Sequence, residues 1–397
     1  MNYLDSVAGI IFKAIILFFA QPLFWLGALV ALLSSILRIK RERKIYRVAI
    51  HKGFNEVRNY LISGLLPGLI ISAIVILLGI TINIEWLWVY PIVVAFCFIL
   101  LGYRFIHPMF TIPITIGVLF ITSYLIKSDS GFSVGMLDFN MDFINTGLVQ
   151  NSLILTILLI LATYFLFKQA LKYLSPNFRK TSRGKWIASY LVKPLTFLPL
   201  FLLVPGQQFT ELFSWWPVFS IGNETYTLVA IPVLIGLRIK IETQPLKVAI
   251  KGIQKDIVLV SLVGIVGTVL SYYVYYAAEV TLLLIFIGGV ATLIRHNIRE
   301  KKWQFLYGPV GDGIKIVGIR PDTPATKMQL EIGETIVVCN NQAVKNDDEF
   351  YQALLINSAY CHLKIRGLDG EYRLTETAIF ADSPHELGIV TIPDKIN

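Results

Sequence analysis

The chain has 397 residues, of which 55% are hydrophobic and 15% are charged. A soluble globular domain carries about 25% charged residues, so most of this chain requires an apolar environment. The formal net charge of +9 comes largely from basic residues that lie beside apolar stretches. Membrane topology accounts for such residues, so we expect no binding to nucleic acid.

Nine apolar segments are candidate membrane spans, because a helix needs about 20 residues to cross the hydrocarbon core of a bilayer. They cover residues 15–37, 61–82, 88–106, 108–126, 149–167, 194–209, 217–237, 257–276 and 280–294. The sixth and seventh are short and are interrupted by Pro194, Pro199, Pro205, Pro217 and Pro232. Non-helical backbone is tolerated at membrane depth when it is buried in protein, so these two segments could instead form a re-entrant pair.

Lysine and arginine concentrate in alternate connections. Residues 38–58, 168–193 and 238–256 are rich in basic side chains, whereas residues 127–148 carry three aspartates against Lys127 alone. Basic connections face the cytoplasm. Nine spans then place the N-terminus outside and the C-terminus in the cytoplasm.

Two short motifs suggest catalysis, but neither has the context that catalysis needs. Gly131–Gly135 (Gly-Phe-Ser-Val-Gly) matches a nucleophile elbow, yet it lies between spans, away from all five histidines on this topology. His385-Glu386 lacks the second histidine of a zinc-protease helix. The three cysteines, Cys97, Cys339 and Cys361, form no Cys-x-x-Cys pair. We therefore expect a protein that is not an enzyme and has no metal site and no cofactor.

The composition changes near residue 301, after which acidic and basic residues mix as in a soluble protein. We therefore divide the chain into a membrane region, 1–300, and a C-terminal domain, 301–397. Turn residues and alternating patterns predict short elements within this domain. They are a strand at Ile314–Ile319, a helix at Ala325–Leu330, a buried strand at Thr335–Cys339, a helix from a capping box at Asn346 and Glu349 to about Ile356, and a hairpin at His362–Arg366 and Glu371–Thr377 around Asp369-Gly370.

The run Thr323–Glu334, followed by the turn Asn340-Asn341, resembles the PDZ domains of bacterial membrane proteins and proteases. Their run reads Ser-Pro-Ala-x-x-Ala-Gly-Leu-x-x-Gly-Asp. This chain departs from it at Met328 and Gln329, and the resemblance covers only the last quarter of the chain. It implies a polytopic α-helical membrane protein with a C-terminal cytoplasmic PDZ-like α/β domain, a partly open β-barrel with two helices.

The PDZ resemblance also implies a peptide-binding groove. Ile314–Ile319 would be an unpaired strand edge that pairs with a peptide, opposite the helix near Asp347–Ile356, and the preceding glycine loop would offer N–H groups to a peptide C-terminus. Asp312 would repel a free carboxylate, so binding of internal segments stays open, as does a domain that only packs or dimerises. Helix phase could also place Phe350 in the core. The groove residues on this interpretation are Gly311, Asp312, Gly313, Ile314, Ile316, Phe350 and Leu354.

The whole architecture resembles the MinJ family of cell-division topological determinants of Gram-positive rods. Local strings support it: Pro22–Trp25 in the first span, followed by Arg38–Lys44. The resemblance implies an adaptor at septum and poles that links the pole- and septum-binding protein DivIVA to the division inhibitor MinD. It also implies contacts with other divisome components and possible self-association. Two alternatives stay open: a regulatory subunit of a membrane protease or signalling complex, and an uncoupled transporter with an appended PDZ domain.

Overall fold

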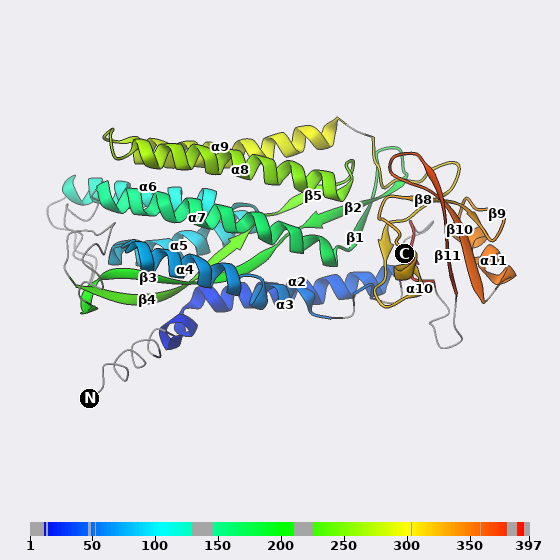
Figure 1. Cartoon of the computed structure of the whole chain (residues 1–397), viewed down its shortest axis with the longest axis horizontal. Helices are drawn as coiled ribbons and strands as arrows, with labels where there is room; N and C mark the ends of the chain where they lie inside the picture. Colours follow the sequence, from blue (N-terminus) through cyan, green and yellow to red (C-terminus); the bar gives the residue numbers. More distant parts are fainter. Residues whose placement is uncertain are drawn as a thin grey trace.

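The structure is a computed structural model of the chain. It describes residue 12 and residues 15–46, 49–51, 53–128, 146–209, 225–302, 304–357, 359–378 and 387–392. Long helices run side by side along the molecule's long axis, and the C-terminal domain sits at one end of them (Figure 1).

Six helices in these residues are long and apolar enough to cross a membrane, and a seventh, α5, is shorter. They confirm a polytopic helical region in seven of the nine predicted segments. α6, α7, α8 and α9 pack against one another, with α5 beside α6. The helices are α2 (Pro22–Tyr46), α3 (Asn55–Ile62) with α4 (Leu65–Leu78) counted as one span, α5 (Ile84–Leu101), α6 (Pro108–Ser128), α7 (Thr146–Ala170), α8 (Leu246–Leu270) and α9 (Ala277–Lys301).

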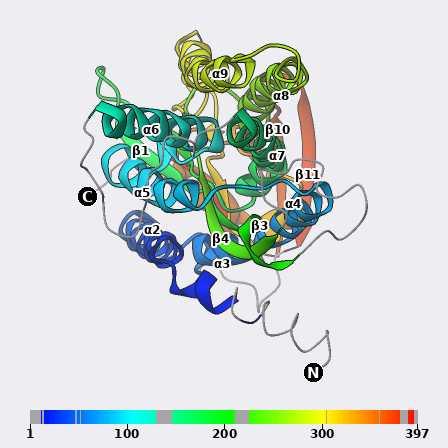
Figure 2. The same ribbon diagram turned by 90° about the vertical axis from the view of Figure 1, so that its left-hand side faces the viewer.

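The predicted helical spans at 194–209 and 217–237 are wrong. Their described residues form two antiparallel strands instead, β3 (Leu195–Phe209) and β4 (Tyr226–Gly236), which we call the β3–β4 ribbon. The ribbon lies among the helices and runs parallel to them, with α2, α3 and α4 packed against it (Figures 1 and 2). This arrangement corresponds to the non-helical pair that the prolines had left open.

Proline explains why these apolar residues form strands. A proline inside a helix removes a hydrogen bond and clashes with the preceding turn. In the ribbon, Pro199 lies directly opposite Pro232. In an antiparallel ladder, alternate residue pairs exchange no hydrogen bonds. Because the two prolines face each other, a single pair of this kind accommodates both.

The outer edges of the ribbon are paired with groups on the surrounding segments. An open sheet edge surrounded by lipid would leave polar backbone groups without partners, which costs several kcal/mol for each group. Here both strands are covered by segments that come from elsewhere in the chain. The contacts are Phe201 N–H to Ser72 Oγ (3.0 Å), Ile82 N–H to Leu203 O (2.8 Å) and Gln21 Nε2 to Ala230 O (2.9 Å).

A three-stranded sheet lies between the membrane helices and the C-terminal domain. Its order is β1 (Pro176–Lys180), β2 (Trp186–Val192) and β5 (Ile239–Ile241). Because β2 leads into β3 and β4 leads into β5, this sheet continues directly from the ribbon. Glu300 at the end of α9 ties the sheet to the helices by accepting hydrogen bonds from the N–H groups of Glu242 (2.8 Å) and Thr243 (3.0 Å).

The C-terminal domain contains open sheets and two helices, and no closed barrel in its described residues. Five strands form one sheet in the order β11–β10–β8–β6, with β9 paired to β8, and β7 pairs with β12. The strands are β6 (Ile314–Lys315), β7 (Gly318–Ile319), β8 (Thr335–Cys339), β9 (Gln342–Ala343), β10 (Tyr360–Arg366), β11 (Tyr372–Ala378) and β12 (Ile389–Val390), and the helices are α10 (Pro324–Lys327) and α11 (Asp347–Ile356).

Local sequence signals in this domain are confirmed. The Asn346 side chain accepts a hydrogen bond from the N–H of Glu349 (2.8 Å) and starts α11 where the sequence predicted, while the Glu349 carboxylate accepts from the Asn346 side-chain amide (2.8 Å) and from the N–H of Lys345 (2.7 Å). Asn340 and Asn341 have φ of 46° and 68°, the left-handed conformation that asparagine tolerates.

The C-terminal domain is docked tightly on the three-stranded sheet. Tyr307 packs edge-on against Tyr190, with ring centroids 4.7 Å apart, and both rings are fully buried. The Tyr190 hydroxyl donates to the carbonyl of Val317 (2.5 Å), and the N–H of Ala188 donates to the carbonyl of Tyr307 (2.8 Å). Val317 and Val390 belong to the same apolar core as the membrane helices, so the two regions share buried side chains.

Glycine permits the close approach of α4 to the ribbon. A Cβ on Gly64 would overlap the carbonyl oxygen of Phe197, although the backbone of Gly64 is in the ordinary right-handed region, with φ of −92°. We therefore expect Gly64→Ala to lower the free energy of unfolding by about 1–3 kcal/mol through overpacking alone. Thermal unfolding of the full chain in detergent measures it.

Gly117→Ala on α6 is the matched control. Nothing lies within 4 Å of a Cβ at Gly117, so this helical substitution should be neutral or add about 0.5–1 kcal/mol. Equal melting temperatures for the two variants would contradict the contact between α4 and the ribbon.

Candidate functional site

The structure divides the predicted edge strand Ile314–Ile319 between two sheets. The segment breaks into β6, which pairs with β8, and β7, which pairs with β12. Ile314 and Ile316 are buried in the domain's own core. Both side chains therefore face the core of the domain, although β6 is the last strand of its sheet.

The predicted loop residues lie at the start of this same sheet. Gly313 packs against β8, where a Cβ would clash with Ile336 and Thr335, and Gly311 has open space around it. Asp312 forms an ion pair with Arg366, with Nη2 2.9 Å from Oδ1. The hydrogen bond from Arg366 holds the pKa of Asp312 below its usual range. Asp312 is thus compensated by a cation of its own domain.

A strand edge that faces a helix is found at β12. Gly388 and Val390 accept hydrogen bonds from Arg320 and Val317 on the β7 side (both 2.8 Å). Backbone groups alternate along an antiparallel strand, so the N–H and carbonyl of Ile389 point to the opposite edge. Among the described residues no strand pairs with that edge.

Helix α11 lies beside this edge. The Thr391 hydroxyl, which follows β12, donates to the Asp347 carboxylate on the first turn of α11 (2.6 Å). Helical periodicity places Tyr351 and Leu354 on the same face as Asp347, at i+4 and i+7. Tyr351 is 62% exposed and Leu354 is partly buried, whereas Phe350 points into the core. We use the name β12–α11 cleft for the outer edge of β12 at Ile389 together with Tyr351 and Leu354 on this face of α11.

Of the predicted groove residues, Leu354 lies on this face of α11, but the sequence prediction did not include the β12 strand. Leu387–Val390 supplies that strand, at the far end of the domain's sequence. Gly388 has φ of +89° and lies against Thr323, where a Cβ would clash. A Leu-Gly-Ile-Val run with a glycine that needs this conformation was the available signal.

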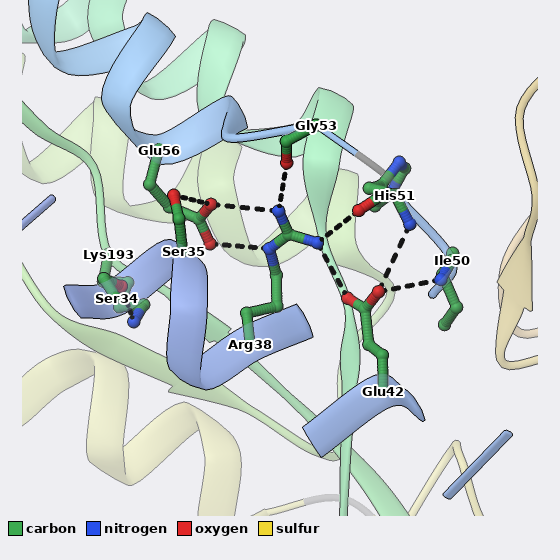
Figure 3. A network of polar contacts seen from close by, with 9 residues as sticks. All are labelled: Ser34, Ser35, Arg38, Glu42, Ile50, His51, Gly53, Glu56 and Lys193. Carbon is green, nitrogen blue, oxygen red and sulfur yellow. Dashed lines mark hydrogen bonds and ion pairs between the residues drawn. The ribbon is translucent and has the colours of Figure 1, made fainter. Parts of the chain in front are cut away.

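A separate network of polar contacts surrounds Arg38 on α2 (Figure 3). Arg38 is only 5% exposed, and all five of its N–H donors are used. It donates to both oxygens of Glu56 (2.7 and 3.1 Å), to Glu42 (3.1 Å) and to the carbonyls of His51 (2.9 Å) and Gly53 (2.8 Å). We call these residues the Arg38 cluster.

The carboxylates of the Arg38 cluster are satisfied as well. Glu42 Oε2 accepts from the N–H groups of Ile50 (2.7 Å) and His51 (3.2 Å), and Glu56 Oε2 accepts from the Ser35 hydroxyl (2.8 Å). Burial lowers the pKa of His51, so its imidazole is neutral beside this network. The cluster therefore fixes the connection between α2 and α3.

The two motifs that had suggested catalysis, Gly131–Gly135 and His385-Glu386, lie outside the described residues. Within the described residues, no group of three or more histidine, cysteine, aspartate or glutamate side chains could hold a metal ion. Cys97, Cys339 and Cys361 are free and buried.

Comparison with curated proteins gives relatives that match nearly the full length. The chain is 30% identical over 387 residues to the cell division topological determinant MinJ of Bacillus subtilis (strain 168), covering 95% of this chain and 94% of that protein. It is 26% identical over 378 residues to the probable cell division topological determinants MinJ of Lacticaseibacillus paracasei and Lacticaseibacillus casei (strain BD-II), covering 94% of this chain and 95% of theirs. No family model matches the chain.

Arg38 is expected to dominate the stability of the α2–α3 connection. Arg38→Met leaves the buried Glu42 and the partly buried Glu56 without their cation, and breaking a buried ion pair in this way costs about 3–5 kcal/mol. Arg43→Met, an exposed position on the same helix, should change the free energy of unfolding little. Denaturant unfolding of the detergent-solubilised chain compares them, and similar midpoints would show that the Arg38 cluster contributes no net stability.

Proposed function

Since this chain belongs to the MinJ family of cell-division topological determinants, we propose that it is a membrane-anchored adaptor that links DivIVA to MinD and thereby prevents misplaced or repeated septation. The observation that carries the proposal is the match to a named division determinant over 95% of the chain. Contacts with further divisome components and self-association belong to the same proposal.

The fold supports an adaptor because it provides two separate attachments. Apolar helices hold the chain in the bilayer, and the β12–α11 cleft offers a strand edge beside a helix, the arrangement in which an extended peptide adds to a sheet. On the helix side the proposed contacts are Tyr351 and Leu354. Phe350, Ile314 and Ile316 would act from beneath, by holding the core that shapes the cleft.

The proposed orientation keeps the N-terminus outside and the C-terminal domain in the cytoplasm, at septum and poles. Replacing two predicted spans by the β3–β4 ribbon removes an even number of crossings, so the orientation predicted from nine spans is unchanged with seven. The basic residues of the α2 end, the β1–β2 region and the α9 end then share the cytoplasmic side.

We propose that the protein acts by binding and performs no chemistry. The Arg38 cluster is used within the protein, and the curated relatives are named for division. Three of the prolines in the predicted sixth and seventh spans, Pro199, Pro205 and Pro232, lie in the ribbon. The regulatory-subunit and transporter alternatives therefore have no observation of their own in their favour.

Reporter fusions test the orientation. A fluorescent protein that matures only in the cytoplasm should be bright when fused after Asn397, and alkaline phosphatase should be active when inserted within residues 129–145. Active phosphatase after Asn397 would reverse the topology.

A charged substitution at an exposed position of α11 tests the cleft without disturbing the core. Tyr351→Glu should weaken capture of DivIVA or MinD from membranes by about tenfold, because an exposed aromatic anchor is lost from the centre of the contact. Cells carrying only this variant should elongate or place septa at wrong positions. Capture of purified partners by the full chain in nanodiscs gives the affinity.

Gln352→Glu adds the same charge one residue further along α11, at another exposed position, and should behave as the wild type. If both variants capture partners normally while deletion of residues 303–397 abolishes capture, the domain binds through another surface. If the deletion also leaves capture and septum position normal, the adaptor proposal fails.

A further inference from the structure

The connection between β1 and β2 is a short hairpin with a well-defined turn. The two strands pair as far as Lys180, which lies opposite Trp186. In the turn that follows, the N–H of Thr181 donates to the carbonyl of Lys185, and the N–H of Gly184 donates to the carbonyl of Thr181 (both 2.9 Å). Gly184 has φ of +77°, a conformation that glycine adopts without strain. We call residues 180–186 the basic hairpin.

The tip of the basic hairpin carries exposed cations and no anion. Lys180, Arg183 and Lys185 are all exposed. Residues 168–193, which contain the whole hairpin, include no aspartate or glutamate. Among the carboxylates that the structure describes, none forms an ion pair with these three side chains. The hairpin therefore presents positive charge that the described part of the protein does not neutralise.

The base of the basic hairpin is fixed close to the ends of the membrane helices. β1 begins shortly after Phe167, where the apolar stretch of α7 ends. Arg179 on β1 forms an ion pair with Glu242 (2.7 Å) and lies over the ring of Phe305, just beyond α9, with its guanidinium carbon 5.4 Å from the ring centroid. An extended chain rises about 3.3 Å per residue, so the tip lies within about 20 Å of this base.

The basic hairpin projects sideways from the helices. In the view along the helices, its tip is the green loop above α6 and to the left of α9, outside the outline of the helices (Figure 2). Lipid surrounds the helices of a membrane protein, so a tip in this position lies over the surface of the adjacent leaflet. Trp186 is half-buried at the start of β2, and the Lys180 ammonium lies over its ring, 5.0 Å from the centroid. Tryptophan is enriched at this depth, where its ring meets the headgroups.

Two kinds of anionic surface could neutralise these cations: an acidic protein or the headgroups of anionic lipids. The position of the hairpin favours lipid, because the bilayer is already beside it and no partner has to be recruited. Each lysine or arginine held near an anionic leaflet is attracted to it, and the attraction falls off within a Debye length.

We propose that the basic hairpin binds anionic phospholipid headgroups at the bilayer surface beside this end of the helices. Lys180, Arg183 and Lys185 contact the phosphates, and Trp186 lies in the headgroup layer. This contact holds the three-stranded sheet, and the C-terminal domain docked on it, against the leaflet. It requires no protein partner, so it can hold or fail independently of the adaptor proposal.

A fluorescent label at the tip tests the proposal. Ser182→Cys places a thiol at an exposed position, whereas the native cysteines Cys97, Cys339 and Cys361 are buried. The full chain is labelled with an environment-sensitive fluorophore and placed in nanodiscs of phosphatidylcholine alone or of an equimolar mixture with phosphatidylglycerol. We expect emission about twofold stronger, and at shorter wavelength, in the mixture. Salt at about 1 M should remove most of this increase, because it shortens the Debye length to about 3 Å.

Matched variants separate charge from other effects. Lys180→Gln, Arg183→Gln and Lys185→Gln combined in one chain should abolish the increase, whereas Lys180→Arg, Arg183→Lys and Lys185→Arg combined should keep it. A label at Gln352→Cys, exposed on α11 at the far end of the molecule, should report no difference between the two nanodiscs (Figure 1). Thermal unfolding shows that each variant is folded.

Two results would overturn the proposal. One is equal emission from the label at Ser182→Cys in the two kinds of nanodisc. The other is an increase that survives removal of the three cations. A response to polyglutamate in phosphatidylcholine nanodiscs, without a response to phosphatidylglycerol, would assign the hairpin to an acidic protein surface instead.

Discussion

The rest of the structure depends on the pairing of backbone groups at the edges of the β3–β4 ribbon. Two strands alone leave both outer edges open, and lipid offers no hydrogen bonds. Ser72 on α4, the extended residues around Ile82 and Gln21 before α2 supply the missing partners. This requirement draws α2, α3 and α4 onto the ribbon. Small residues then allow the approach, since Gly64 and Gly68 lie where any side chain would overlap the strand.

Fixing the ribbon also fixes what lies at one of its ends. β2 and β5 extend directly from it and carry the surface on which the C-terminal domain docks, through Tyr190 and Tyr307. Arg179 holds the same surface by a bidentate pair with Glu242 (2.7 and 2.8 Å). Burial acts to raise the pKa of Glu242, but the hydrogen bonds from Arg179 and Lys240 outweigh it and hold that pKa below its usual range. The docking surface therefore keeps its charges at neutral pH.

The sequence predicted elements well where local chemistry decides the outcome. Apolar length located seven helices, and capping and turn residues such as Asn346, Asn340 and Gly370 located most of the C-terminal elements. Helix ends were missed where charged residues are buried. The first predicted span ends at residue 37, but α2 continues to Tyr46 because Arg38 and Glu42 form an ion pair inside the protein. The ribbon and the β12 strand were missed because their formation depends on partners distant in the chain. Periodicity cannot tell an apolar strand from an apolar helix, and a strand of two residues has no periodicity.

Rigid docking has a consequence for the proposed role as an adaptor. A binding domain on a flexible linker explores a large volume, so its effective concentration near any one partner is low and its orientation is not set. Here a single apolar core reaches from the helices to Val317 and Val390, next to β12. The β12–α11 cleft is thus held in a set position relative to the apolar helices. A partner bound there pays less orientational entropy to meet other membrane-bound proteins, which suits a determinant whose role is to specify position.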